Sequence, residues 1–455
     1  MGQSSIASYN GIHAIVGARI EIGDGRVLEK GTVIIKNGLI VAVAVDAAVP
    51  RGAEVLDGKG LTVYPGFIDG YTTKGFTAPA ARPAETDQNA DNPNYASAFM
   101  RETVRVGIRP EIQAAENLSL TDEVLKGYQT NGFTTIMVVP SGGDISGVSA
   151  LVNLSGRPTR ECVVLPRFAE SIGFSGPSGS YPSSLMGHIA QVRQTLIDAN
   201  WLTKLDKSFQ AGGGTRPPTD PSLSALLPLL SGKLPAIYDA DNSAQIGRAL
   251  TLSSEFGMRS VLAGGTEAWK RIEDIKAAGA PVLVALSFGA EPGTSPAKPD
   301  APKPVDAKQD AAKTESSTAD PENPAETAER KRLYEETLKN ASLLANSGIP
   351  MAFTTKGTAS TTVFMENLRK AVKAGLSKEA ALKSLTIDAA KSFGVDRQLG
   401  TVEAGKIANV IVTSTDFLDP QMKVKMLYID GRKIDPGKGK TPPTFRFQFH
   451  EDGGN

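Results

Sequence analysis

The residue types that most often carry metal or nucleophilic chemistry are few in this chain. It has three histidines and one cysteine among 455 residues, whereas zinc sites need three or four ligands drawn mainly from His, Cys and carboxylate side chains. His13 precedes the first predicted strand, His450 lies in the polar C-terminal tail, and His188 falls on a predicted amphipathic helix. We interpret His188 as a helix-surface or buried structural residue. A conventional binuclear zinc site is therefore not expected.

Three glycine-rich segments could contribute backbone N–H groups to a ligand site. Residues 140–149, which include Ser146, follow a predicted strand, and residues 174–183 have the same composition. Such loops can line a polar site, but solvent loops with turn glycines fit equally well. Residues 264–266 open a predicted helix, where unpaired amides favour an anion. Helix capping by Thr266 is the preferred interpretation there.

The middle of the chain alternates strand-like and helix-like segments. Apolar runs of strand length occur at 134–139, 236–238, 260–262, 281–285 and 350–353. Helical patterns occur at 119–131, 244–255, 266–278, 328–345 and 377–392. This alternation predicts an α/β protein with a parallel sheet, and the number of units favours a (β/α)8 TIM-type barrel. An open doubly wound sheet is the alternative, because periodicity does not show closure.

Both ends of the chain are rich in short β-branched runs separated by turns. Asn37-Gly38 between two such runs is a strong hairpin signal. Because each end has too few strands for a core of its own, we expect residues 11–63 and 401–435 to form one small composite β-sandwich. The barrel would then occupy residues 64–400.

One segment interrupts the barrel pattern. Residues 289–327 contain no aromatic residue, and seven prolines fall between Pro292 and Pro324. Such a composition buries too little apolar surface to offset the entropy of ordering. We predict a mobile surface insertion, with a partner-binding segment as the alternative.

The overall charge limits the classes of partner. Forty-nine Lys and Arg balance 49 Asp and Glu, so neither nucleic acid nor an anionic membrane is an expected partner.

No apolar run approaches the roughly 20 residues of a membrane span. Cys162, in an apolar run, is interpreted as a buried small residue and does not decide the redox compartment. We expect a soluble protein, cytoplasmic as written, or exported or periplasmic if a leader has been removed.

Two long motifs at opposite ends of the chain resemble the amidohydrolase superfamily. Residues 31–40 and 55–69, the latter ending in Pro65-Gly66-Phe67-Ile68-Asp69, are similar to the segment that enters the family's barrel. Residues 385–394 and 399–409 are similar to its exit. The likeness is closest to the imidazolonepropionase-like branch. It implies a barrel with a β-sandwich from both termini, and metal-assisted hydrolysis of C–N bonds in non-peptide amides or cyclic amides.

The resemblance also implies positions for metal ligands, and this sequence departs from most of them. Tyr71 and Thr73 stand where the family has a His-x-His pair after the residue equivalent to Asp69. Gly264 stands at the sixth-strand histidine. Only Glu170, near the fourth-strand lysine or glutamate, keeps the chemistry of a ligand.

Three charged residues occupy the remaining positions. Asp239 and Asp241 lie near the fifth-strand histidine, and Lys356 replaces the eighth-strand aspartate. An ammonium can neutralise two carboxylates without a metal, so we expect Lys356 near Asp239 or Asp241. These three are the candidate catalytic residues. The expected ligand pocket consists of Asp69, Tyr71, Thr73, Ser146, Glu170, Asp239, Asp241, Gly264, Thr266 and Lys356.

Three functions are consistent with these residues. By descent the chain is a hydrolase of amide or cyclic amide C–N bonds, with a degenerate metal site and without ordinary metal-dependent activity. No cofactor is expected, and a single divalent metal held by carboxylates is the alternative. The other hypotheses are a non-catalytic relative that binds a small molecule, and a structural partner of an active paralogue. Association of this chain with copies of itself, as a homo-oligomer, is the alternative to a paralogue partner.

Overall fold

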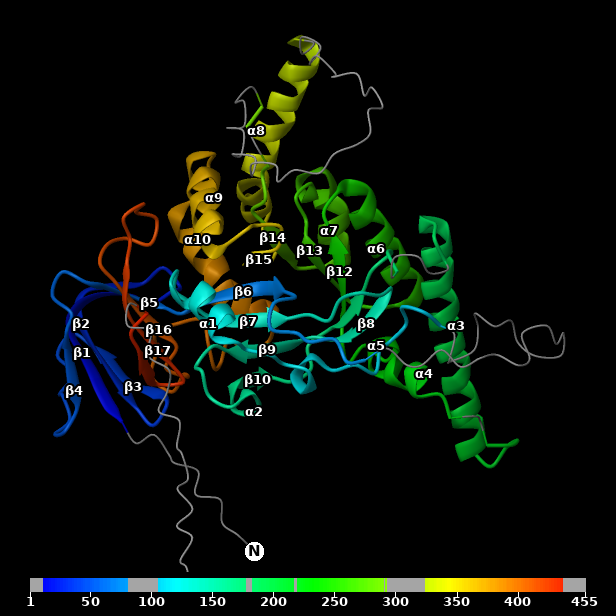
Figure 1. Cartoon of the computed structure of the whole chain (residues 1–455), viewed down its shortest axis with the longest axis horizontal. Coiled ribbons are helices and arrows are strands. Elements are labelled where there is room, and N and C mark those ends of the chain that lie inside the picture. Colours follow the sequence, from blue (N-terminus) through cyan, green and yellow to red (C-terminus); the bar gives the residue numbers. More distant parts are fainter. Residues whose placement is uncertain are drawn as a thin grey trace, which may run out of the picture.

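Strands from both ends of the chain form one sheet in the computed structural model, which describes residues 11–80, 105–176, 182–216, 219–289, 291–292 and 324–436 (Figure 1). The sheet contains β1 (Ile12–Glu21), β2 (Val27–Lys36), β3 (Leu39–Ala44), β4 (Glu54–Asp57), β5 (Thr62–Pro65), β16 (Val410–Thr413), β17 (Val424–Ile429) and β18 (Arg432–Ile434). Its order is β18-β17-β16-β5-β1-β2-β3, with β4 also pairing with β1. The two ends therefore share backbone pairing, while folding of this sheet into a two-layered sandwich stays a prediction.

The predicted hairpin at Asn37-Gly38 is present between β2 and β3. Asn37 has φ 52° and Gly38 has φ 82°, as a two-residue turn matching the strand twist requires. A similar turn at Asp430-Gly431 joins β17 to β18. A Cβ on Gly431 would lie 2.6 Å from Gly38 Cα, so the two turns pack directly on each other and tie the chain ends together.

The strands of the middle region fall into two further sheets. One has the order β10-β9-β7-β6 and the other β15-β14-β13-β12-β11-β8. Their bounds are β6 (Phe67–Thr72), β7 (Phe133–Val138), β8 (Ile145–Val148), β9 (Ala150–Asn153), β10 (Val163–Leu165), β11 (Glu170–Ile172), β12 (Ala236–Ala240), β13 (Ser260–Gly264), β14 (Val282–Ala285) and β15 (Met351–Thr354). The run from β11 to β15 is parallel throughout, and the fold is of the mixed α/β class.

The two middle sheets meet at both edges. Thr354 Oγ1 at the end of β15 donates to the carbonyl oxygen of Tyr71 in β6 at 2.5 Å. On the other side, β8 and β9 flank Ser149, so one stretch of chain passes from one sheet to the other. No backbone ladder joins β15 to β6 among the described residues, and a closed eight-stranded barrel stays a prediction.

Part of the glycine-rich segment 140–149 is not a loop. Residues 145–148 form β8, antiparallel to β11. Gly147 has φ 118°, and a Cβ there would lie 2.3 Å from the carbonyl oxygen of Ile112. This glycine permits close packing of two backbones, which composition alone does not distinguish from a turn.

Helices cover the middle sheets (Figure 1). They are α1 (Asp122–Gln129), α2 (Thr159–Cys162), α3 (Leu185–Gln210), α4 (Pro221–Ala225), α5 (Leu227–Leu230), α6 (Ser243–Phe256), α7 (Ile272–Ala278), α8 (Pro324–Asn346), α9 (Thr361–Lys373), α10 (Lys378–Leu385) and α11 (Ile387–Ser392), with 3-10 turns η2 (Ala114–Glu116) and η3 (Ala268–Arg271). In α6, Asn242 and Gln245 form a capping box and Gly257 ends the helix. No helix of the described residues is long and apolar enough to cross a membrane.

The predicted insertion at 289–327 lies largely outside the described residues. Residues 290 and 293–323 are not described, so its mobility stays a prediction. The helix that follows starts at Pro324, four residues before the position expected from the spacing of its apolar residues.

Alternating side chains of the middle strands pack into two separate cores. Tyr238 and Leu262 belong to the core that includes helical residues from α3, α6 and α9. We call this first cluster the outer core. Ile237 and Ala263, on the opposite face of the same strands, belong to a second core, which we call the inner core. Phe393, after α11, packs in this second core and makes an edge contact with Phe168, with ring centroids 5.1 Å apart.

Asn409 links the end sheet to the middle strands. Its buried side-chain amide donates to Asn153 Oδ1 at 2.8 Å and to Thr135 Oγ1 at 3.1 Å. Its Oδ1 accepts from the backbone N–H of Asp430 at 2.9 Å, and its carbonyl oxygen accepts from Gly66 N at 2.8 Å. Both side-chain donors and the acceptor are satisfied, so one residue joins three parts of the fold.

We predict that Asn409→Leu lowers the free energy of unfolding by about 2 kcal/mol or more, because two buried side chains and the half-buried N–H of Asp430 each lose a hydrogen bond while side-chain volume is nearly kept. Chemical denaturation at neutral pH measures the change. Asn346→Leu, the same change on an exposed residue, should alter stability by less than about 0.5 kcal/mol. Equal effects of the two variants would contradict a linking role for Asn409.

Candidate functional site

Three charged side chains meet at the carboxyl ends of β12 and β15. Lys356 Nζ donates to Asp239 Oδ1 at 2.5 Å and to Asp241 Oδ2 at 2.7 Å. The lysine side chain is 17% exposed, and the aspartates are 49% and 44% exposed. The ammonium is thus the more buried partner, and both carboxylates keep contact with solvent. Lys356 thus lies near both aspartates, as predicted from the sequence.

Hydrogen bonds to the backbone hold this cluster in place. Asp241 N donates to Gln245 Oε1 at 2.9 Å, within the cap of α6. Thr266 Oγ1 donates to the carbonyl oxygen of Asp241 at 3.0 Å. Lys356 N donates to Thr354 Oγ1 at 3.0 Å. Thr266 therefore positions Asp241, and the predicted helix capping by Thr266 is wrong, because Glu267 is the N-cap of η3 and no side chain caps this turn.

Because Gly264 has no side chain, the ion pairs of Lys356 fit in the space beside it. It ends β13 with φ 106°, and a Cβ there would lie 2.1 Å from Asp241 Oδ1 and 3.0 Å from Lys356 Nζ. A contact of 2.1 Å is far inside van der Waals distance. Any side chain at this position would displace the Asp241 carboxylate.

Tyr71 adds a phenol to the cluster. The pairing of β6 with β7 shifts register between Asp69 and Thr72, and such a bulge re-aims side chains, which accounts for Tyr71 packing in the inner core. Burial raises the pKa of the Tyr71 hydroxyl, and the charges of Asp239 and Asp241 raise it further. The hydroxyl therefore stays protonated at neutral pH and is a hydrogen-bond donor.

Asp69 is a structural carboxylate. It is fully buried, and its oxygens accept from Thr355 N at 2.9 Å, Thr355 Oγ1 at 2.6 Å and Tyr128 OH at 3.1 Å. Burial raises the pKa of this carboxyl group, while these hydrogen bonds act in the opposite direction. Asp69 thus connects β6, the segment after β15 and α1. Thr73, which was predicted to line the same ligand pocket, is exposed.

Two other predicted pocket residues lie elsewhere. Ser146 Oγ donates to the carbonyl oxygen of Gly143 at 3.1 Å and closes its own loop. Glu170 is buried on the face of β11 that also carries Ile172, a member of the outer core, whereas the preceding Ala169 packs in the inner core. The structure therefore does not bring Ser146 or Glu170 to the Lys356 cluster. The register of a three-residue strand is not readable from the sequence.

The buried histidine of α3 belongs to an Asp–His pair that sequence analysis missed. His188 Nδ1 lies 2.8 Å from Asp144 Oδ2, and Gly176 N donates to Nε2 at 3.4 Å. The pair holds two loops against the helix, which agrees with a structural role for His188.

His13, in β1, lies 3.2 Å from Glu54. No group of three or more His, Cys, Asp or Glu within the described ranges could hold a metal ion.

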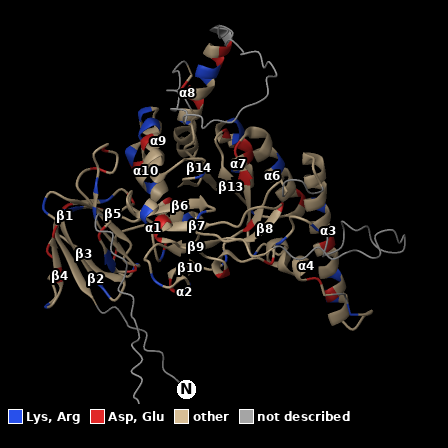
Figure 2. Cartoon of the chain, in the orientation of Figure 1, with Lys and Arg blue, Asp and Glu red and all other residues tan. Residues whose placement is uncertain are grey.

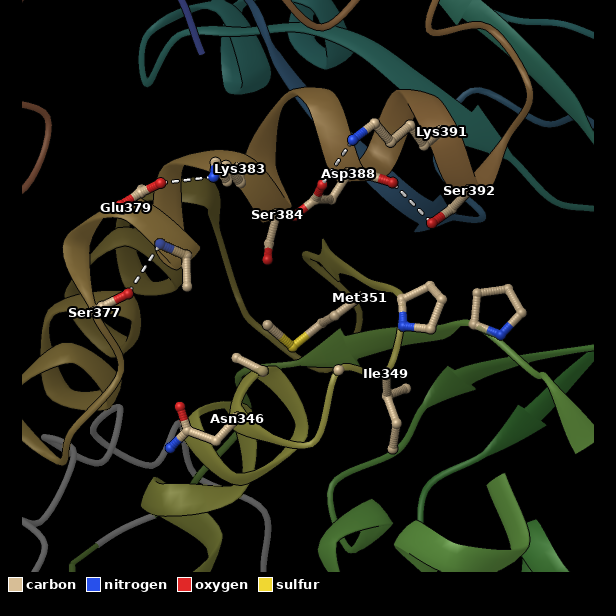
Figure 3. Close-up of a pocket in the computed structure, with 15 residues that line it drawn as sticks. Asn346, Ile349, Met351, Ser377, Glu379, Lys383, Ser384, Asp388, Lys391 and Ser392 are labelled. Atoms are coloured by element: carbon tan, nitrogen blue, oxygen red, sulfur yellow. Dashed lines mark hydrogen bonds and ion pairs between the residues drawn. The ribbon is translucent and has the colours of Figure 1, made fainter. Parts of the chain in front are cut away.

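A cavity of about 750 Å³ lies at the opposite ends of the strands (Figure 3). Pro281 and Pro350, which directly precede β14 and β15, line it together with Met351. Lys383 and Lys391 lie across from Met351, paired with carboxylates of the same helices. The cavity is therefore separate from the Lys356 cluster, and no motif in the sequence pointed to it.

Comparison with known proteins finds a partial family match and a shared fold. Residues 302–434 match the model of the amidohydrolase family. An amidohydrolase from Thermotoga maritima MSB8 has 21% sequence identity and a TM-score of 0.71, covering 92% of this chain and 99% of its own. No curated protein matches the sequence.

Two further solved structures share the fold at lower similarity. A putative prolidase from Bifidobacterium longum has 16% identity and a TM-score of 0.52, covering 93% of this chain and 95% of its own. The ochratoxinase of A. niger has 16% identity and a TM-score of 0.50, covering 94% and 97%. The family match covers residues 302–434, and the solved structures show a shared fold.

We predict that Gly264→Ala destabilises the protein more than Gly257→Ala. Both glycines have positive φ, but a Cβ on Gly257 meets nothing within 4 Å. The Gly257 variant should cost about 1 kcal/mol through backbone strain alone, and the Gly264 variant about 3 kcal/mol through strain and overpacking. Denaturant titration measures both. The excess should shrink in an Asp241→Ala background, and an unchanged excess would show that Asp241 is not the clashing group.

Glu170 should make stability depend on pH. Burial raises the pKa of its carboxyl group well above the ordinary value, opposed by Arg167. Because the folded state binds this proton more tightly than the unfolded state, the stabilisation is present below the unfolded pKa of about 4.3 and is lost as pH rises through the folded pKa. We expect Glu170→Gln to be more stable than wild type at pH 8 and to have a flatter pH profile between pH 5 and 8. Parallel profiles would exclude Glu170 as the source.

Proposed function

We propose that this chain is a degenerate amidohydrolase-superfamily protein. By descent it is a hydrolase of amide or cyclic amide C–N bonds, but it binds a small polar ligand at the carboxyl ends of its strands without ordinary metal-dependent activity. The observation that carries the proposal is the Lys356 ammonium bonded to both Asp239 and Asp241. The parent class is supported by the comparisons, and the loss of metal chemistry is our inference.

The residues of this cluster do not fit a catalytic metal. Two carboxylates are fewer than the three protein ligands of a catalytic zinc site or the six to eight oxygens around calcium. Gly264 supplies no donor, and its side-chain space is taken by Asp241. A divalent ion at the carboxylates would also face the ammonium of Lys356 at close range, where like charges repel strongly.

The charge of the cluster limits the ligand. One lysine and two aspartates leave a net charge of −1, and each carboxylate is nearly half exposed. Carboxylate oxygens accept hydrogen bonds, whereas the buried hydroxyl of Tyr71 donates one. These groups favour a small ligand with a cationic or neutral N–H donor, such as an amine or an amide, over an anion.

Metal content and turnover test the proposal directly. We expect zinc, manganese and nickel far below one equivalent per chain in purified protein, measured by elemental analysis. Added metal should not produce hydrolysis of N-acyl amino acids or cyclic amides. Stoichiometric zinc, together with turnover that is lost on chelation and in Asp239→Ala, would overturn the proposal.

Removing the ammonium should create the cation site that wild type lacks. In Lys356→Ala the two carboxylates lose their counter-charge, so we expect measurable Mn²⁺ or Zn²⁺ binding by calorimetry where wild type shows none. The stability cost should be only about 1 kcal/mol, because both aspartates are nearly half exposed. Lys370→Ala, an exposed lysine of α9, is the matched control. Equal cation binding by wild type and Lys356→Ala would contradict the role of Lys356.

A further inference from the structure

A groove of about 520 Å³ lies between α3 and α6, on the helical layer outside the strands. Figure 2 shows basic residues on both helices. The lining combines apolar and cationic side chains, namely Phe174, Ile189, Leu252, Arg193, Arg248 and Arg271. Three guanidinium groups around one small groove are an unusual concentration of positive charge in a chain with no net charge.

Two of the arginines are already paired. Arg193 Nη2 lies 2.7 Å from Glu255 Oε2. Arg271 Nη1 lies 3.0 Å from Asp274 Oδ2, and its Nε donates to Ser243 Oγ at 3.0 Å. These contacts fix the two side chains and neutralise their charges, so they shape the groove but leave it no surplus charge.

Arg248 supplies the surplus. Within the described part of the chain its guanidinium makes no hydrogen bond or ion pair, and its Nε is buried. A buried N–H without an acceptor is costly, and a planar guanidinium is well suited to a carboxylate or phosphate. The groove thus holds a positive charge that an oxyanion can satisfy.

Gly247 gives the groove its depth. It precedes Arg248 on α6, and a Cβ there would lie 3.4 Å from Arg271 Nη2. A larger side chain at this position would fill the space beside Arg271 without removing any charge. Because Gly is a poor residue for a helix interior, such a substitution should not weaken α6.

We propose that this groove binds a small organic oxyanion, a carboxylate or a phosphate, with Arg248 on the charged group and Phe174, Ile189 and Leu252 on its apolar part. The inference is independent of the proposed function, because the Lys356 cluster has the opposite net charge and lies at the strand ends. It therefore describes a second ligand site.

Calorimetric titration of the full chain with benzoate, inorganic phosphate and the neutral isostere benzamide tests the site. We expect saturable binding of at least one of the two anions and none of benzamide. Benzoate alone would indicate an apolar carboxylate, and phosphate alone a phosphate group. Absence of binding by both anions at millimolar concentration would overturn the proposal.

Variants separate this groove from other cationic surfaces. Arg248→Gln should weaken anion binding by about tenfold or more, the loss expected for a charged hydrogen bond. Gly247→Leu should weaken it similarly while keeping every charge. Arg259→Gln, whose guanidinium instead donates to Gly232 and Lys233 carbonyl oxygens, should bind as wild type does. Unchanged affinity in Gly247→Leu and Arg248→Gln would exclude the groove.

Discussion

The ammonium of Lys356 connects the ends of strands that are more than one hundred residues apart in the sequence. Because the carboxyl ends of parallel strands meet at one face, the side chains there must satisfy one another or repel. Lys356 neutralises Asp239 and Asp241, Gly264 provides the room, and Thr266 holds the carbonyl oxygen of Asp241. The geometry of the candidate site follows from this single positive charge and from the absence of a side chain beside it.

The aspartates of this region differ in burial and in hydrogen-bond partners. Asp69 is buried beneath hydroxyl and amide donors, so it serves the joint between β6 and β15. Asp239 and Asp241 have the same functional group but keep nearly half of their surface in solvent. Of these three aspartates, only Asp239 and Asp241 are exposed enough to contact a bound ligand. At the other end of the strands, Phe393 packs in the inner core.

The positions of helices and strands were easier to predict from the sequence than the face of a strand on which each side chain lies. The helix α6 was predicted within a few residues because its hydrophobic spacing is strong, and β14 because its apolar run is continuous. β8 was missed because Gly147 indicated a turn while it serves close backbone packing. Glu170 was expected in the ligand pocket but lies on the face of β11 that carries Ile172, since alternation over three residues fixes no register. The Asp144–His188 pair was missed because its members are distant in sequence and share no motif.

The pairing of β5 with β16 also constrains how the molecule is assembled in time. Residue 65 lies opposite residue 410 in this ladder, so almost the whole middle region is a loop closed by one antiparallel pair. Closing so long a loop is entropically unfavourable until its contents are compact, and contacts of such separation form slowly. During synthesis, the N-terminal strands emerge first and must wait for β16. The exposed edge of β5 is then open to pairing with other chains, which makes this edge the point where folding competes with aggregation.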